Sequence, residues 1–305
     1  MGHESKIVVG VDGSAQSLRA LDWAMQEAVA RERELVLVCA YTVPAFSATT
    51  LDGGFAALND AAIRAGAEQV LVASAVHAET AGVTVSTELA VGDASGVLVA
   101  ASKTADLVVV GSRGRGGFAG RLLGAVSSAL PAHASCPTVV VPLRETQDGA
   151  TVPVKRIVVG VDGSPSSELA LRHAVVEAEM WQAELVAVAG VPVAQMTGVL
   201  AWLPSAVDTE KVLRDHETSV SQMLDRVLEG HDLRVRRIVL DGTGAELLTE
   251  FSSAADLIVV GSRGRGGFAG LLLGSTSQAV LHHSQCPVMI INSRNTLADE
   301  TPPDE

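Results

Sequence analysis

The sequence predicts an α/β fold made of two tandem doubly wound domains, each built on a five-stranded parallel sheet. Two observations predict this fold. Residues 111–120 recur letter for letter as residues 261–270, an offset of 150 in a chain of 305. Each copy also alternates short apolar runs with segments of helical periodicity, which is typical of a parallel sheet covered by helices on both faces. A period this long indicates two whole domains, because solenoid repeats span roughly 20–50 residues.

The first copy opens with an apolar run at 6–12 that is rich in β-branched residues, as expected of a strand buried on both faces. Ser14 or Ser17 then offers the N-cap of a helix that continues to the charged stretch at 31–34. Further strands are expected at 35–41, 83–91, 106–111 and 137–142, with helices at about 58–81, 94–104 and 124–134.

The second copy repeats the plan. Strands are expected near 156–162, 184–190, 233–240, 256–261 and 287–292, with helices near 165–182, 207–230, 244–255 and 275–284. We predict domains at 1–145 and 154–296, joined by a linker at 145–153. The acidic, proline-containing segment 297–305 is expected to be a disordered tail.

Composition restricts the classes of partner. The chain is 48% hydrophobic and 19% charged, as expected of a globular protein, and its net charge is −13. With a pI near 5.0 it lacks the basic surface that nucleic acids or anionic membranes require. There is no run of 18 apolar residues and no basic region followed by an apolar one at the N-terminus. We therefore expect a cytoplasmic protein with no nucleic-acid or membrane partner.

The three cysteines have no metal-ligand spacing. Cys39, Cys136 and Cys286 form no CxxC pair, and two of them occupy equivalent positions just before the last strand of each copy. We expect all three to be reduced and structural, and we predict no metal site in the protein itself.

The two strongest motifs follow the first and the fourth strands. Asp12 ends the first strand of copy one, and Gly111 ends the fourth. In doubly wound sheets, ligands bind beyond the carboxyl ends of the strands, at the point where the strand order reverses. The two motifs would meet at that point if the first and fourth strands are neighbours.

Glycines recur after the fourth strand at one spacing, G-x2-G-x9-G, at Gly111, Gly114 and Gly124 and again at Gly261, Gly264 and Gly274. The first two of each set allow backbone amides to approach an anion without interference from a Cβ atom. The third opens a helix whose free N–H groups and dipole favour phosphate. A long turn is the alternative, but retention of the whole loop in two diverged copies favours a phosphate cradle. A nicotinamide fingerprint would follow the first strand instead, and no Walker A loop occurs.

Together these residues resemble the universal stress proteins in their tandem-domain form. The resemblance rests on the I-V-V-G-V-D-G-S start of each copy, the G-x2-G-x9-G-(S/T) signature and the C-P-V-x-(V/I) final strand, and it covers nearly the whole chain. The family's ATP-binding branch implies a Rossmann-like, adenine nucleotide alpha hydrolase-like domain with strand order 3-2-1-4-5. It also implies one ATP site in each copy, with or without magnesium.

The resemblance assigns a role to each kind of residue in these sites. The aspartate would contact the nucleoside, the glycine two positions before it would line the adenine pocket, and the backbone at the end of the second strand would read the adenine edge. The valine would flank the base or sugar, and the signature glycines and the helix start would hold phosphates. The expected nucleotide-binding residues are Gly10, Asp12, Ala40, Val110, Gly111, Gly114, Gly124, Ala125, Val126 and Ser127 in copy one, and Gly160, Asp162, Gly190, Val260, Gly261, Gly264, Gly274, Ser275, Thr276 and Ser277 in copy two.

One position departs from the family pattern. Ala125 stands where the family has Ser or Thr, whereas copy two has Ser275. A hydroxyl that makes one hydrogen bond is worth about 1 kcal/mol net, so the first site is expected to bind several-fold more weakly. The loop arginines either pair with phosphates or face solvent; they are Arg113, Arg115, Arg263 and Arg265.

The leading hypothesis is an ATP-binding regulatory protein of the stress response, with no catalytic residues. A slow ATPase or phosphotransferase is the alternative, although Asp12 is the only obvious carboxylate and the loop has no lysine. A nucleotide-free interaction module and a cyclic AMP-binding protein are further alternatives.

The fifth strands at 138–141 and 288–291 would be aggregation-prone edges if they were left open. The family's dimers therefore imply that the two copies pair through these strands inside one chain. Further homodimerisation of tandem chains is left open.

Overall fold

The computed structural model describes residues 5–42, 60–114, 123–143, 153–192, 209–264 and 272–295. Copy one contains β1 (Lys6–Gly10), α1 (Ala15–Arg31), β2 (Glu34–Tyr41), α2 (Asp60–Glu79), β3 (Val85–Val91), α3 (Ala94–Ala101), β4 (Leu107–Gly111), α4 (Ala125–His133) and β5 (Thr138–Val141). Copy two contains β6 (Arg156–Gly160), α5 (Pro165–Trp181), β7 (Glu184–Val191), α7 (Thr209–Val227), β8 (Val235–Asp241), α8 (Gly244–Phe251), β9 (Leu257–Gly261), α9 (Ser275–His283) and β10 (Val288–Ile291).

All strands and helices expected from the sequence are present, with ends that differ by a few residues. The predicted tail at 297–305 and nearly all of the predicted linker at 145–153 lie outside the described residues. The proposed domain limits of 1–145 and 154–296 therefore stay predictions.

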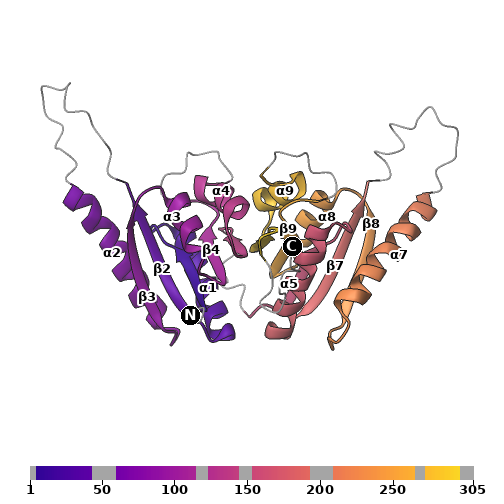
Figure 1. Cartoon of the computed structure of the whole chain (residues 1–305), viewed down its shortest axis with the longest axis horizontal. Coiled ribbons are helices and arrows are strands. Elements are labelled where there is room, and N and C mark those ends of the chain that lie inside the picture. Colours follow the sequence, from indigo (N-terminus) through magenta and orange to yellow (C-terminus); the bar gives the residue numbers. More distant parts are fainter. Residues whose placement is uncertain are drawn as a thin grey trace, which may run out of the picture.

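The strands form one ten-stranded sheet in the order β3-β2-β1-β4-β5-β10-β9-β6-β7-β8, and Figure 1 shows the two copies side by side. Each copy has the expected order 3-2-1-4-5, and all pairs within a copy are parallel. The single antiparallel pair among these strands joins β5 to β10, with Val139 opposite Met289. The predicted intrachain pairing of the fifth strands is therefore confirmed.

The continuous apolar runs of the strands are explained by burial on both faces of the sheet. Ile7 and Val9 belong to one hydrophobic core, which is covered by α1, α2, α5 and α7, whereas Val8 belongs to the other, under α3, α4, α8 and α9. Each core contains residues of both copies. The copies therefore share their two cores rather than folding around separate ones.

Serine caps fix the start of the first helix of each copy. The Ser14 hydroxyl accepts a hydrogen bond from the Ser17 amide at 3.1 Å, so Ser14 is the N-cap, and the Ser17 hydroxyl donates back to the Ser14 carbonyl. Ser164 caps α5 in the same way. Both helices therefore begin three residues after the aspartate that follows the first strand of their copy.

The three cysteines are buried, and none of them forms a disulfide. Burial, with a contribution from the charge of Asp106, raises the pKa of the Cys136 thiol to about 12, so this thiol stays protonated. The described residues contain no group of three or more side chains suited to holding a metal ion.

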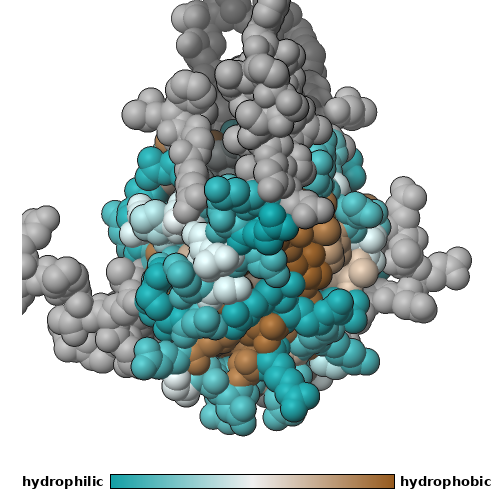
Figure 2. Space-filling model, turned by 90° about the vertical axis from the view of Figure 1, so that its right-hand side faces the viewer, coloured by the Kyte–Doolittle hydropathy of each residue, from teal (hydrophilic) through white to brown (hydrophobic). Residues whose placement is uncertain are grey.

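The described part of the chain has no helix that is long and apolar enough to cross a membrane. The outer face of copy two is largely hydrophilic, with smaller apolar patches (Figure 2).

A buried polar cluster joins α1 to α5. The Arg31 guanidinium donates to the Glu27 carboxylate at 2.5 Å and also to Glu177, and the Trp181 indole donates to the other Glu27 oxygen at 3.1 Å. Glu27 and Glu177 are 0% and 1% exposed. Trp181 occupies the position equivalent to Arg31, so two carboxyl groups share one guanidinium. Burial and the neighbouring charge of Glu27 raise the pKa of Glu177 well above its ordinary range.

The raised pKa of Glu177 makes the stability of the fold depend on pH. The pKa of Glu177 in the folded protein exceeds the unfolded value near 4.5. The stability that the protonated carboxyl contributes is therefore complete below pH 4.5, and it declines as the pH rises from there toward the folded pKa. Glu177→Gln keeps an oxygen acceptor for Arg31 and has no proton to lose. At pH 8 it is expected to raise the free energy of unfolding by about 1–2 kcal/mol, with little change at pH 4, in urea titrations.

Glu27→Gln is the matched control. Both Glu27 carboxylate oxygens accept hydrogen bonds. In the variant an amide NH₂ group replaces one of these oxygens and faces a donor, so the free energy of unfolding should fall by about 1–3 kcal/mol. If Glu177→Gln were as destabilising as Glu27→Gln at pH 8, the protonated state of Glu177 would be refuted.

Candidate functional site

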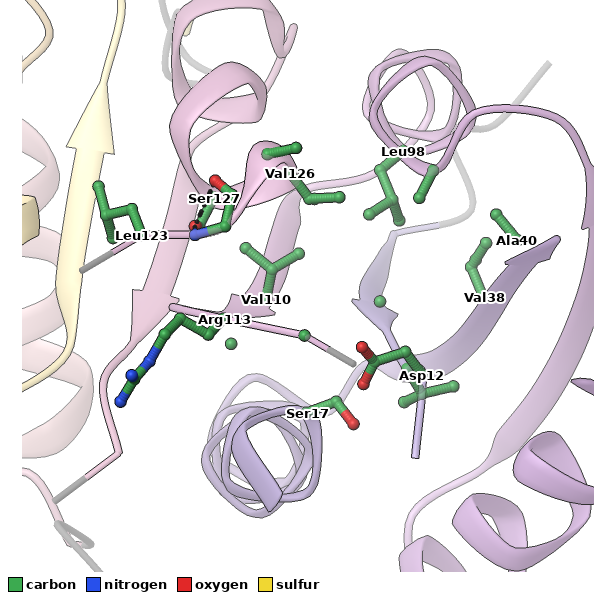
Figure 3. Close-up of a pocket in the computed structure, with 17 residues that line it drawn as sticks. Asp12, Ser17, Val38, Ala40, Leu98, Val110, Arg113, Leu123, Val126 and Ser127 are labelled. Atoms are coloured by element: carbon green, nitrogen blue, oxygen red, sulfur yellow. Dashed lines mark hydrogen bonds between the residues drawn. The ribbon is translucent and has the colours of Figure 1, made fainter. Parts of the chain in front are cut away.

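Each copy has a cavity at the carboxyl ends of its strands, where the order reverses between the first and fourth strands. The cavity of copy one, between β1 and β4, measures about 370 Å³, and that of copy two, between β6 and β9, about 490 Å³. All ten residues predicted for each copy line its cavity. Figure 3 shows how the labelled ones surround the cavity of copy one.

The aspartate after the first strand is held in place by the helix start that follows it. Asp12 Oδ1 accepts hydrogen bonds from the amide and the hydroxyl of Ser14, at 2.9 and 2.6 Å. Asp162 Oδ1 accepts one from the Ser164 amide at 2.9 Å. Each cavity therefore contains one carboxylate in a fixed orientation.

Two signature glycines lie where the backbone comes too close to a neighbour for a side chain. A Cβ atom on Gly111 would lie 2.7 Å from the backbone carbonyl of Gln16 in α1, and one on Gly114 would lie 2.3 Å from Asp12 Oδ2. Gly264 has the same relation to Asp162, also at 2.3 Å. The end of β4 and the loop after it therefore pack directly against the first turn of α1 and against the carboxylate.

The helix after the loop presents its N-terminus to the cavity. Gly124 is the N-cap of α4, with no side chain to bond the free amides of the first turn. The Ser127 hydroxyl is buried and donates to the Ser112 carbonyl at 2.7 Å, which ties the start of α4 to the end of β4. Ser277 does the same in copy two, with Ser262 at 3.0 Å. Both serines line the cavities, but their hydroxyl groups donate to the backbone carbonyls of Ser112 and Ser262.

The apolar wall of the cavity was not predicted from the sequence. Val38, Ala94 and Leu98 line it in copy one, and Val188, Gly244 and Leu248 in copy two. Two local signals identify them afterwards: Val38 precedes Ala40 by two positions on one face of β2, and Leu98 follows Ala94 by one helical turn. The cavity thus combines an apolar recess, a carboxylate and a helix N-terminus.

Only two of the four loop arginines belong to the described residues, and both line the cavities. Arg113 and Arg263 line the cavities, and the Arg113 side chain extends away from the Asp12 carboxylate (Figure 3). Arg115 and Arg265 lie outside the described residues.

The walls of the two cavities differ at four equivalent positions, Ala40 and Gly190, Ala94 and Gly244, Ala125 and Ser275, and Val126 and Thr276. A Cβ atom on Gly190 would lie 2.6 Å from the Gly244 amide nitrogen, so the start of α8 rests directly on the end of β7. In copy one the Ala40 methyl occupies the equivalent position. The sites are therefore unequal both at the strand end and at the helix N-terminus.

Comparisons with known proteins place the chain in one family. The family model of the universal stress protein family matches residues 4–142 and again residues 153–292. Universal stress protein Rv2005c of Mycobacterium tuberculosis is 36% identical over 296 residues, which cover 93% of this chain and 96% of that protein.

Solved structures give the same result for the fold. A universal stress protein from Archaeoglobus fulgidus superposes with a TM-score of 0.68 at 20% identity, covering 95% of this chain and 98% of its own. A universal stress protein solved in complex with cAMP matches 48% of this chain at 27% identity, with a TM-score of 0.36; the ligand is a property of that protein. With two family domains along its length, the chain belongs to the universal stress protein family as a tandem-domain member.

Proposed function

We propose that the protein is an ATP-binding regulatory protein with one nucleotide site in each copy. The observation that supports this best is the combination, in one cavity, of an apolar recess, a fixed carboxylate and a helix N-terminus. Adenine, ribose and phosphate need these three environments in that order. The residues proposed to bind the nucleotide are those predicted from the sequence, with the apolar wall added.

The chemistry of each part fits the nucleotide. Val38, Leu98 and Val110 offer apolar surface to the base. The Asp12 carboxylate accepts hydrogen bonds, and ribose hydroxyls donate them. The first turn of α4 provides free amides and the positive end of the helix dipole for phosphate.

Magnesium fits as a companion of the phosphates rather than as a resident metal. Asp12 and Asp162 are the only carboxylates among the described residues that line their cavities. Magnesium is commonly held by one or two carboxylates together with substrate phosphates and water. Either aspartate would supply that one ligand, and the nucleotide and water the others.

An enzyme that transfers phosphoryl groups is the second candidate, and the lining residues favour it less. Such chemistry needs a base or a water-positioning group beside the γ-phosphate as well as a metal carboxylate. The described lining residues offer one carboxylate per site and no lysine. We therefore propose that occupancy by ATP, rather than its hydrolysis, alters the conformation or assembly of the protein.

Phosphate release from ATP by the purified protein should separate these two functions. Turnover is expected to be far slower than about one per second, the lower end of the range typical of kinases. Steady release at that rate, abolished by Asp12→Asn together with Asp162→Asn, would overturn the regulatory function.

Nucleotide binding itself can be tested with one glycine variant for each site. Gly114→Ala and Gly264→Ala place a methyl group against the aspartate of their site, and each should weaken ATP binding at that site about a hundredfold, which leaves the other site to be observed. Isothermal titration measures this effect. Gly66→Ala, on α2, is the control, because its added Cβ meets nothing within 4 Å.

Chromatography of nucleotides released from the denatured wild-type protein would distinguish ATP from cyclic AMP. If the wild-type protein bound no nucleotide in either experiment, the protein would instead be a nucleotide-free interaction module.

The two sites should differ in affinity. With site two disabled by Gly264→Ala, the additional variant Ala125→Ser is expected to raise the ATP affinity of site one about fivefold, because it restores one hydrogen bond to phosphate. Ser275→Ala in the Gly114→Ala background should lower the ATP affinity of site two by a similar factor. Equal ATP affinities in the two glycine variants alone would refute the inequality.

A further inference from the structure

The chain segment after β10 contacts the helix that carries the phosphate end of the other copy's cavity. The Asn292 side-chain amide donates to the Ala134 carbonyl at 2.7 Å, and the Arg294 guanidinium donates to the Ala132 carbonyl at 2.7 Å. Both carbonyls lie at the C-terminal end of α4, where a helix leaves its last carbonyls without intrahelical partners. We name Asn292, Arg294 and Asn295 the clasp.

The clasp is fixed within copy two. Asn292 Oδ1 accepts from the Arg294 amide at 2.9 Å, and Asn295 Oδ1 accepts from the Asn292 amide at 2.7 Å. The Asn295 carbonyl lies 3.1 Å from Nε2 of His173 on α5, and Asn292 and Asn295 are both buried. The donors that reach α4 are therefore held by β10 and α5, not by a free chain end.

The helix that the clasp holds has little stability of its own. α4 has nine residues, its N-cap Gly124 has no side chain, and Pro131 removes one amide donor from its interior. Helices this short are marginal without tertiary contacts. Its hydrophobic contacts through Leu130 anchor it to the core, while hydrogen bonds at its two ends fix its position along its own axis.

We propose that Asn292 and Arg294 of copy two are positioning residues for the phosphate end of the nucleotide site in copy one. The inference rests on the proposed ATP-binding function. The first turn of α4 lines the cavity, so displacement of the helix moves the amides that face the phosphates. A guanidinium at the helix C-terminus also complements the dipole that favours phosphate at the N-terminus.

The Asn292 contact is not repeated in the opposite direction, from copy one to copy two. The residue of copy one equivalent to Asn292 is Pro142, which has no side-chain donor. In α9, Leu281 replaces Pro131, so the second helix keeps the amide that the first one lacks. Copy one therefore has no side-chain donor at this position that could bond the C-terminal end of α9.

Site-resolved titrations test the inference. In the Gly264→Ala background, which leaves site one to be observed, Arg294→Ala is expected to weaken ATP binding about fivefold, the equivalent of one lost hydrogen bond. Adenosine affinity should stay unchanged, because adenosine has no phosphate to reach α4. Arg294→Lys keeps a donor for the Ala132 carbonyl and should restore ATP affinity. In the Gly114→Ala background, Arg294→Ala should leave ATP binding at site two unchanged.

The controls separate positioning from general destabilisation. Arg294 is exposed, so its truncation is not expected to unfold the chain, and thermal unfolding verifies this. An unchanged ATP affinity at site one, or an equal loss for ATP and adenosine or at both sites, would overturn the positioning role while leaving the proposed function intact. If the wild-type protein bound no nucleotide at all, the proposed function would fail, and the positioning role with it.

Discussion

The antiparallel pairing of β5 with β10 is the contact on which the rest of the molecule depends. Both strands are four residues long and buried throughout, so each would be an open apolar edge without the other. The pairing joins two five-stranded sheets and lets both hydrophobic cores run through both copies. It also brings α1 against α5 and places the segment after β10 at the end of α4. The buried cluster and the clasp exist only because of it.

A contact between two copies in one chain is free to be asymmetric, unlike the isologous interface of a homodimer. The buried cluster shows this freedom, since Arg31 has Trp181 as its counterpart and serves both Glu27 and Glu177. The clasp shows it again, since Asn292 reaches α4 whereas the equivalent Pro142 has no donor to offer. Duplication within one chain thus allows each copy to specialise while the pairing of the strands is kept.

The sequence predicted the features that depend on local pattern. Strands buried on both faces appear as continuous apolar runs, and the cavity could be located because Asp12 follows β1 and Gly111 ends the neighbouring strand β4. The clasp and the buried cluster could not be predicted, because their partners lie 146 to 162 residues apart and meet only through the pairing of β5 with β10. Ser127 shows a subtler limit: its position near the cavity was predictable, but the bond of its hydroxyl to the Ser112 carbonyl depends on how the start of α4 lies against the end of β4.

The repeated glycines are confined by the packing of the backbone around them. Gly111 and Gly114 lie where a Cβ atom would strike backbone or the aspartate, and their counterparts in copy two are confined in the same way. Packing alone is therefore enough to explain why both copies have glycine at these positions, whatever the cavity binds. Four positions of the cavity wall do differ between the copies, among them Val126 and Thr276. These glycines thus reflect a constraint of the fold, and a difference in ligand preference between the two sites must be sought in the wall positions that have diverged.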